Sequence, residues 1–302
     1  MAAHVDGHDL RGVGLAVAAY SFWGLIPVYW KHLAHVPVVE VLAHRMSWTL
    51  LFFAGLMLSR GTGLGEARRL LSSGRACGAL LLTAALLGLN WSIFIYAISA
   101  NRVLAASLGY FITPLVSVAL GMVFLQERLR RAHWLAIGAA AAGVAQLAMR
   151  APSHLWIAFA LALSFGLYGL LRKTLTVAPL LGSTIESLFL FPVGLCILAF
   201  LMGTHQSVTG NGDAVSHLLL LGAGCVTGFP LLLFAKATKR LPLYVIGILQ
   251  YLAPTGQFLL AVLVYREDFS SAQLRSFALV WLGLAIFTWD LVQANRRLWR
   301  LP

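Results

Sequence analysis

The stretch NWSIFIYAISANRVLAASLGYFITPLVSVALGMVFLQER, from Asn90 to Arg128, decides the fold of this chain. It predicts the end of one apolar helix, a turn at Asn101 and Arg102, and a second apolar helix broken by a proline. The second helix carries small or polar residues at spacings of three, four, three and four, which place them on one helical face. They are Ser107, Tyr110, Pro114, Ser117 and Gly121.

A second copy of this stretch lies 140 residues downstream, where the segment from Pro114 to Glu127 is matched by the segment from Pro254 to Glu267. The same spacing of small and polar residues recurs at Gly247, Gln250, Pro254, Gln257 and Ala261. The chain is therefore a duplicated apolar unit.

The composition of the chain is that of a membrane protein. Of its 302 residues, 60% are hydrophobic and only 11% are charged, whereas soluble domains carry about 25% charged residues. Apolar runs of about 20 residues recur from end to end, and each is long enough to cross a bilayer. The alternating pattern of a membrane β-barrel is absent. The three cysteines form no CxxC pair, so we expect no disulfide framework, no metal site and no cofactor.

We predict an all-α integral membrane protein with ten transmembrane helices, joined by short connections. The predicted spans are 12–31, 38–59, 76–99, 103–125, 132–149, 153–171, 183–203, 216–236, 241–264 and 273–292. They divide into two five-helix repeats, 12–149 and 153–292. Because five is an odd number, the second repeat must enter the membrane inverted relative to the first. Inverted repeats are common in secondary transporters, whose binding sites lie near the bilayer midplane.

The net charge of +12 lies mostly between the apolar runs, which favours topology-setting charge over nucleic-acid binding. One face collects 16 Lys and Arg residues, including those of 60–75, 128–131 and 236–240, while the other collects five. We therefore expect both termini on the cytoplasmic side and the lipid bilayer as the surrounding medium.

Four runs in order resemble the RarD-type permeases, the chloramphenicol-sensitive proteins of the EamA branch of the drug/metabolite transporter superfamily. They are EVLAHR (40–45), LNWSIFIYAI (89–98), LGYFITPLVSVALGMVFLQERL (108–129) and FGLYGLLRK (165–173). The resemblance covers nearly the whole chain. It implies ten helices in two EamA repeats, a location in a bacterial inner membrane and export of a metabolite or drug-like compound, without naming a substrate.

The paired prolines predict where a substrate cavity lies. A proline has no N–H for the carbonyl four residues earlier, so the carbonyls of Tyr110 and Gln250 are expected to lose their helical partners. Aromatic and polar residues at similar depth complete the expected lining. The candidate cavity residues are Asn90, Trp91, Phe94, Ser107, Tyr110, Pro114, Ser117, Tyr168, Gln250, Tyr251, Pro254 and Gln257. Trp30 is instead expected in the interfacial aromatic belt.

Four ionisable residues are candidates for proton coupling or charged contacts. Glu40 and His44 are one helical turn apart, and Arg45 lies deeper in the same span. Glu186 is the lone acid of its span. Charged groups inside a span usually face the bundle interior and often take part in function. A structural Glu–His–Arg cluster and an interfacial carboxylate remain the respective alternatives.

The sequence thus predicts a secondary transporter that moves a small organic solute by alternating access, with coupling to protons as a further hypothesis. A lipid flippase on the same scaffold is one alternative, and it would carry an outward-facing polar stripe on span four or nine. A non-transporting sensor or assembly partner is another. The chain is not expected to be an enzyme, because no catalytic or nucleotide-binding motif is present.

Overall fold

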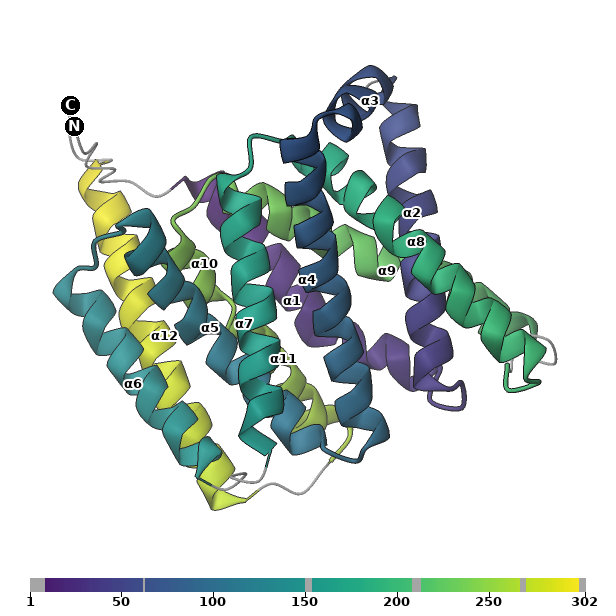
Figure 1. The fold of residues 1–302 in the computed structure, drawn as a ribbon. Helices are drawn as coiled ribbons and strands as arrows, with labels where there is room; N and C mark the ends of the chain where they lie inside the picture. Colours follow the sequence, from purple (N-terminus) through teal and green to yellow (C-terminus); the bar gives the residue numbers. More distant parts are fainter. Residues whose placement is uncertain (1–8, 62, 150–153, 208–212, 267–269, 299–302) are drawn as a thin grey trace.

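The protein, described by a computed structural model over residues 9–61, 63–149, 154–207, 213–266 and 270–298, is a bundle of long helices (Figure 1). The elements of the first half are α1 (Leu10–Lys31), α2 (Val38–Ser59), α3 (Leu64–Ser72), α4 (Gly74–Ser99), α5 (Val103–Leu125) and α6 (Arg131–Ala148). Those of the second half are α7 (Leu155–Thr174), α8 (Pro179–Gly203), α9 (Ala214–Thr238), α10 (Leu243–Leu249), α11 (Leu252–Leu259), the π-helix η2 (Leu260–Val264) and α12 (Ser271–Leu298).

The predicted helical membrane fold is confirmed. Nine helical segments of the described chain are long and apolar enough to cross a membrane, with α10, α11 and η2 counted together as one. The one predicted span outside these nine is 132–149, which corresponds to α6, a shorter helix that carries Arg131, His133 and Gln146. In Figure 1 the first residues of α1 and the last turns of α12 lie at the same end of the bundle, which we call the terminal end.

Two local predictions were wrong. Pro114 does not break its helix, because α5 runs without interruption from Val103 to Leu125. In the second half the break falls between α10 and α11, at Gln250 and Tyr251, four residues before Pro254. The Gln250 carbonyl also keeps a partner, because it accepts from the Ala253 N–H at 3.1 Å. A tighter turn thus replaces the helical bond that Pro254 removes.

The short helix α3 was not predicted and lies in the connection 60–75. None of its residues is buried, and its charged side chains Glu66, Arg68 and Arg69 lie between Leu64 and the pair Leu70 and Leu71. Such an amphipathic segment suits the surface of a membrane at the terminal end.

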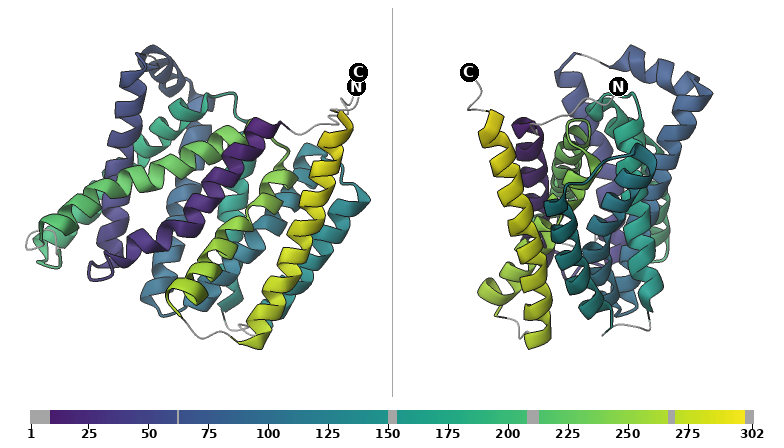
Figure 2. Two further views of the ribbon diagram at one scale, coloured as in Figure 1. Left: turned by 180° about the vertical axis from the view of Figure 1, so that it is seen from behind. Right: turned by 90° about the vertical axis from the view of Figure 1, so that its left-hand side faces the viewer.

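The packing pairs the two halves as a duplication would. Helix α6 lies along α12, α2 along α8, and α5 along α10 (Figures 1 and 2). Other contacts follow the same correspondence between the halves. Helix α1 packs against α9, and their counterparts in the other half, α7 and α4, pack against each other. Both Gln126 and Arg266, which are 140 positions apart, have a left-handed φ of 54° just after their spans. Glu267, the predicted counterpart of Glu127, lies outside the described residues.

Candidate substrate cavity

A cavity of about 510 Å³ lies inside the bundle, between helices of both halves. Helices α1, α2, α4 and α5 contribute to its wall, as do α7, α9, α11 and Gln250 at the break before α11. Leu33, Ala34 and Val36 of the α1–α2 connection and Val103 at the start of α5 also line it. The cavity therefore extends from the middle of the bundle to the end opposite the terminal end. Its size lies in the range of pockets that hold small organic molecules, roughly 300–1,000 Å³.

Most of the predicted cavity residues come together in this wall. They are Asn90, Trp91, Phe94, Ser107, Tyr110, Gln250, Pro254 and Gln257, together with the predicted charged residue Arg45. The Asn90 amide is fixed by α7, where its Nδ2 donates to the Leu161 carbonyl at 2.9 Å and to Ser164 Oγ at 3.0 Å. The Gln257 amide donates to the Trp23 carbonyl at 3.2 Å. These bonds tie together helices that lie far apart in the sequence.

Pro114 and Ser117 do not line the cavity, because α10 packs against this side of α5. A Cβ added at Gly247 would lie 2.7 Å from the Pro114 carbonyl oxygen and 3.2 Å from Ser117 Cβ. Glycine therefore allows the two backbones to approach, and the contact buries Ser117 to 4% exposure. On the face of α5 that carries small and polar residues, Pro114 and Ser117 therefore serve helix packing on the terminal side of the cavity.

Tyr168 and Tyr251 also lie outside the lining. The Tyr251 hydroxyl donates to the Phe111 carbonyl at 3.2 Å, so it joins α5 to the break before α11. The Tyr168 hydroxyl donates to Glu186 Oε2 at 3.2 Å. Both rings are almost fully buried, and their polar ends are satisfied by protein groups.

The acidic candidates and His44 are likewise absent from the cavity wall. Glu40 is fully buried, and one of its carboxylate oxygens accepts from Ser207 Oγ at 2.6 Å. The His44 ring stacks parallel to Trp48 and accepts from its indole N–H at 3.0 Å. Glu40 thus ties α2 to the segment after α8 near the open end, whereas the His44 contacts with Trp48 lie within α2.

Tyr20 and Phe165 line the cavity but were not predicted there, whereas Trp23 was expected at this depth. Tyr20, Trp23 and Phe165 belong to a cluster with Phe234, whose ring lies 5.2 Å from Phe165 and 5.9 Å from Trp23. Trp30, expected in an interfacial belt, also lines the cavity. An apolar side chain inside an apolar span gives no local signal of which way it faces, so only the packing assigns these residues.

Arg45 is the only charged side chain among the described residues that line the cavity. Its Nε donates to Thr227 Oγ1 of α9 at 3.1 Å. Its Cζ lies 4.9 Å from the ring centre of Trp91 and 5.2 Å from that of Trp30. These indole rings attract the cation and hold the guanidinium at a defined place in the wall.

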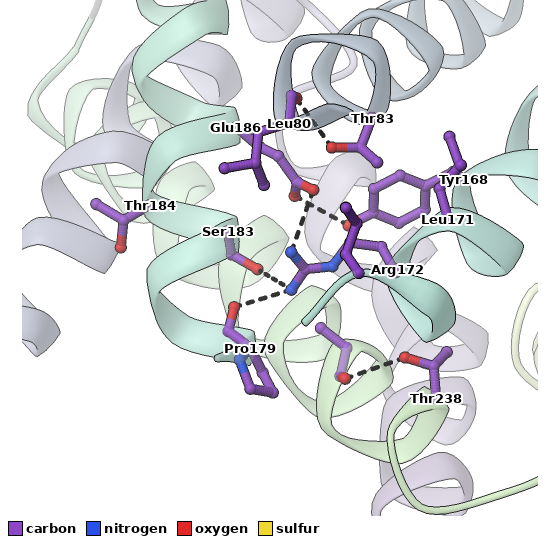
Figure 3. A network of polar contacts seen from close by, with 12 residues as sticks. Leu80, Thr83, Tyr168, Leu171, Arg172, Pro179, Ser183, Thr184, Glu186 and Thr238 are labelled. Carbon is purple, nitrogen blue, oxygen red and sulfur yellow. Dashed lines mark hydrogen bonds and ion pairs between the residues drawn. The ribbon is translucent and has the colours of Figure 1, made fainter. Parts of the chain in front are cut away.

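A buried ion pair closes the bundle on the terminal side (Figure 3). Arg172 of α7 and Glu186 of α8 are each 1% exposed, and Nη1 donates to Glu186 Oε1 at 3.2 Å. The other guanidinium nitrogen, Nη2, donates to the Pro179 carbonyl at 2.9 Å and to Ser183 Oγ at 3.3 Å. The network therefore clamps the end of α7 to the first turns of α8, and it was not predicted from the sequence.

Gly182 makes room for this network. A Cβ at this position would lie 2.0 Å from Arg172 Nη1, so any larger residue would displace the guanidinium. The same Arg172 leaves its Nε without a hydrogen-bond partner in the part of the chain that the structure describes. The clamp thus depends on tight packing around a charge that is not fully satisfied.

Glu127 forms a second closing contact at the terminal end. Its Oε1 accepts from the Leu243 N–H at 2.7 Å and its Oε2 from the Tyr244 N–H at 2.9 Å, which caps the start of α10. The left-handed turn at Gln126 returns the chain so that Glu127 reaches this position. The carboxylate thereby joins the end of α5 to α10, across the two halves.

Two lysines complete the closed end. Lys173 Nζ donates to the Leu241 carbonyl at 2.6 Å, and Lys239 Nζ donates to the carbonyls of Lys173 and Leu175. Burial lowers the pKa of Lys239 to about 8, and the neighbouring Arg172 and Lys173 add to the effect. Helices α7 and α9 are therefore held together at the end where the cavity does not open.

Comparison with known proteins identifies the chain. The EamA-like transporter family matches it twice, over residues 10–149 and 152–289. The chain belongs to the EamA-like transporter family. Within it, this chain is a RarD-type permease, as its similarity to proteins named RarD indicates.

Protein RarD of Escherichia coli (strain K12) is 41% identical over 287 residues, which cover 95% of this chain and 97% of that protein. "Uncharacterized transporter YojE" of Bacillus subtilis (strain 168) is 41% identical over 289 residues, covering 95% and 96%. "Chloramphenicol-sensitive protein RarD" of Pseudomonas aeruginosa is 32% identical over 290 residues, again covering 95% and 96%. This EamA protein is therefore a multi-pass membrane transporter.

A solved crystal structure shares the fold of this EamA protein. It aligns with a TM-score of 0.72 over 92% of this chain and 97% of the other, at 20% sequence identity. That likeness concerns the arrangement of helices alone.

Proposed function

We propose that this EamA protein is a secondary transporter of a bacterial inner membrane that exports a small organic solute by alternating access. The observation that carries the proposal is a cavity built by both halves that extends to one end of the bundle while the other end is clamped. With both termini in the cytoplasm, as the distribution of Lys and Arg predicts, the cavity opens away from the cytoplasm.

The cavity wall also contains polar atoms that lack partners. The Tyr20 hydroxyl and Gln250 Oε1 are buried, and neither has a hydrogen-bond partner among the described residues. Both residues line the cavity. Buried polar atoms are nearly always paired, so we expect these two to gain partners from a bound solute or in the opposite state.

The alternative of a lipid flippase receives less support from the polar stripe. Tyr110 of α5 and Gln250 at the break after α10 line the interior cavity, and Ser117 of α5 is buried against α10. A lipid headgroup that slides along the bundle would need such residues on the lipid-facing surface, as stated above. The stripe thus favours a solute enclosed between the two halves.

Filling the cavity is expected to abolish transport. Ser107 lines the cavity and is exposed within it, so the Ser107→Trp variant places an indole in the path without disturbing a packed core. Solute counterflow in proteoliposomes should fall by about 10-fold or more, because the added side chain occupies the space that the solute needs. Solutes for this assay come from a thermal-shift screen of the purified protein.

The matched control is Ser92→Trp, which places the same side chain at an exposed position of α4 outside the cavity lining. Equal counterflow in the Ser107→Trp and Ser92→Trp variants would show that the solute does not pass through this cavity. A solute that binds without any counterflow would favour a sensor or an assembly partner.

Proton coupling is part of the proposal and rests on Glu40, His44 and Glu186. Glu186 must be ionised to pair with Arg172, so a proton that reaches it weakens the clamp at the closed end. In the double variant Glu40→Gln/Glu186→Gln, counterflow is expected to lose most of its dependence on pH, because glutamine cannot take up or release the proton that a carboxylate can. The Glu66→Gln variant, which changes an exposed residue of α3, should keep that dependence. A pH profile unchanged in the double variant would exclude coupling through these two carboxylates.

A further inference from the structure

The charge of the cavity is unbalanced. Arg45 contributes the only ionised group to the described lining, and no carboxylate of the described chain lies within ion-pair distance of it. Thr227 accepts from Nε, and the two Nη atoms make no hydrogen bond to any described residue. A cation surrounded by apolar walls is unfavourable unless an anion pairs with it, so the site is electrostatically incomplete.

The guanidinium is held in a geometry that suits one kind of partner. The bond from Nε to Thr227 and the rings of Trp91 and Trp30 fix its plane and position. The two free Nη atoms form a planar fork, and such a fork matches the two oxygens of a carboxylate. A lysine would supply the charge without this fixed fork.

The rest of the cavity is suited to an apolar body. Trp23, Phe94 and Phe165 line it together with aliphatic residues of α1, α2 and α4. Aromatic rings bind other rings by stacking and by edge contacts. The Tyr20 hydroxyl, a buried donor without a partner, lies in the same wall.

We propose that the solute is an organic anion, whose carboxylate pairs with Arg45 and whose aromatic or aliphatic body packs against Trp23, Phe94 and Phe165. This inference rests on the proposed transport function, because it assigns the chemistry of the transported solute. It excludes organic cations, since an added positive charge would be placed beside Arg45 with no acid to offset it.

Three probes that share one body test the charge preference. They are 3-phenylpropionate, 3-phenylpropan-1-ol and 3-phenylpropylamine, and binding to the purified full-length protein is followed by quenching of tryptophan fluorescence, since tryptophans line the cavity. The carboxylate should bind about 10-fold tighter than the alcohol, and the amine should bind weakest. In Arg45→Gln the advantage of the carboxylate over the alcohol should disappear, while Arg45→Lys should keep part of it.

The matched control is Arg60→Gln, which removes an exposed arginine at the other end of the same helix and should keep the full preference. Equal binding of the three probes, tightest binding of the amine, or a preference that survives Arg45→Gln would overturn the inference. Absence of carboxylate binding at millimolar concentration would overturn it as well.

Counterflow of the same probes separates this inference from the transport function. A carboxylate that binds through Arg45 but shows no counterflow would refute transport and leave the anion site standing. Counterflow of the alcohol or the amine that Arg45→Gln does not reduce would refute the anion site and leave transport standing.

Discussion

Replacing Arg172 by leucine is expected to lower the free energy of unfolding by about 3–5 kcal/mol, the usual cost of leaving one member of a buried ion pair alone. Glu186 would keep its position at 1% exposure with no cation beside it, and the Pro179 carbonyl and Ser183 would lose their donor. Unfolding by SDS in mixed micelles, followed by tryptophan fluorescence, measures the change.

The double variant Arg172→Leu/Glu186→Leu separates the charge from the packing. Removing both partners leaves no unpaired charge, so most of the lost stability should return. The Arg60→Leu variant, at an exposed position just after α2, is the control and should change stability by less than about 0.5 kcal/mol. If Arg172→Leu unfolds with the wild-type midpoint, the clamp does not hold α7 to α8 in the membrane protein.

The helices were predictable because hydrophobicity and span length decide them. In the hydrocarbon core of a membrane there is no water to bond the backbone N–H and C=O groups, so a chain segment must form these hydrogen bonds internally. An apolar run of sufficient length therefore becomes a helix. The 140-residue repeat also fixed which helices would correspond. The exact site of the break in the second half was not predictable, because the sequence shows that Pro254 removes one helical bond but not that Gly247 of α10 packs against α5 just before the turn at Gln250.

The polar residues of the cavity were largely predicted, and its apolar residues largely were not. Asn90, Tyr110 and Gln250 stand out in an apolar sequence, because a polar group in a span needs a partner or a cavity. Tyr20 and Phe165 do not stand out among similar neighbours. The Arg172–Glu186 pair joins two helices across a turn, and spacing alone does not reveal a contact of that kind.

Alternating access makes a reciprocal prediction for two serines of α5. Ser107 is exposed in the open cavity, whereas Ser117 is 4% exposed where α5 meets Gly247 of α10. If the closed end opens when the cavity closes, Ser117 becomes accessible from the terminal side as Ser107 becomes inaccessible. The substitution of serine by cysteine changes one atom, so each position reports on accessibility with little effect on packing.

The most direct measurement is therefore the labelling rate of Ser107→Cys and Ser117→Cys by an impermeant maleimide, applied from either side of membrane vesicles. The background lacks Cys77, Cys196 and Cys225, which are free thiols. Adding a solute that supports counterflow should change the two rates in opposite directions by about 10-fold, with Ser107→Cys labelled from the side opposite the termini and Ser117→Cys from the terminal side. Rates that both stay constant, or that rise and fall together, would contradict alternating access around this cavity.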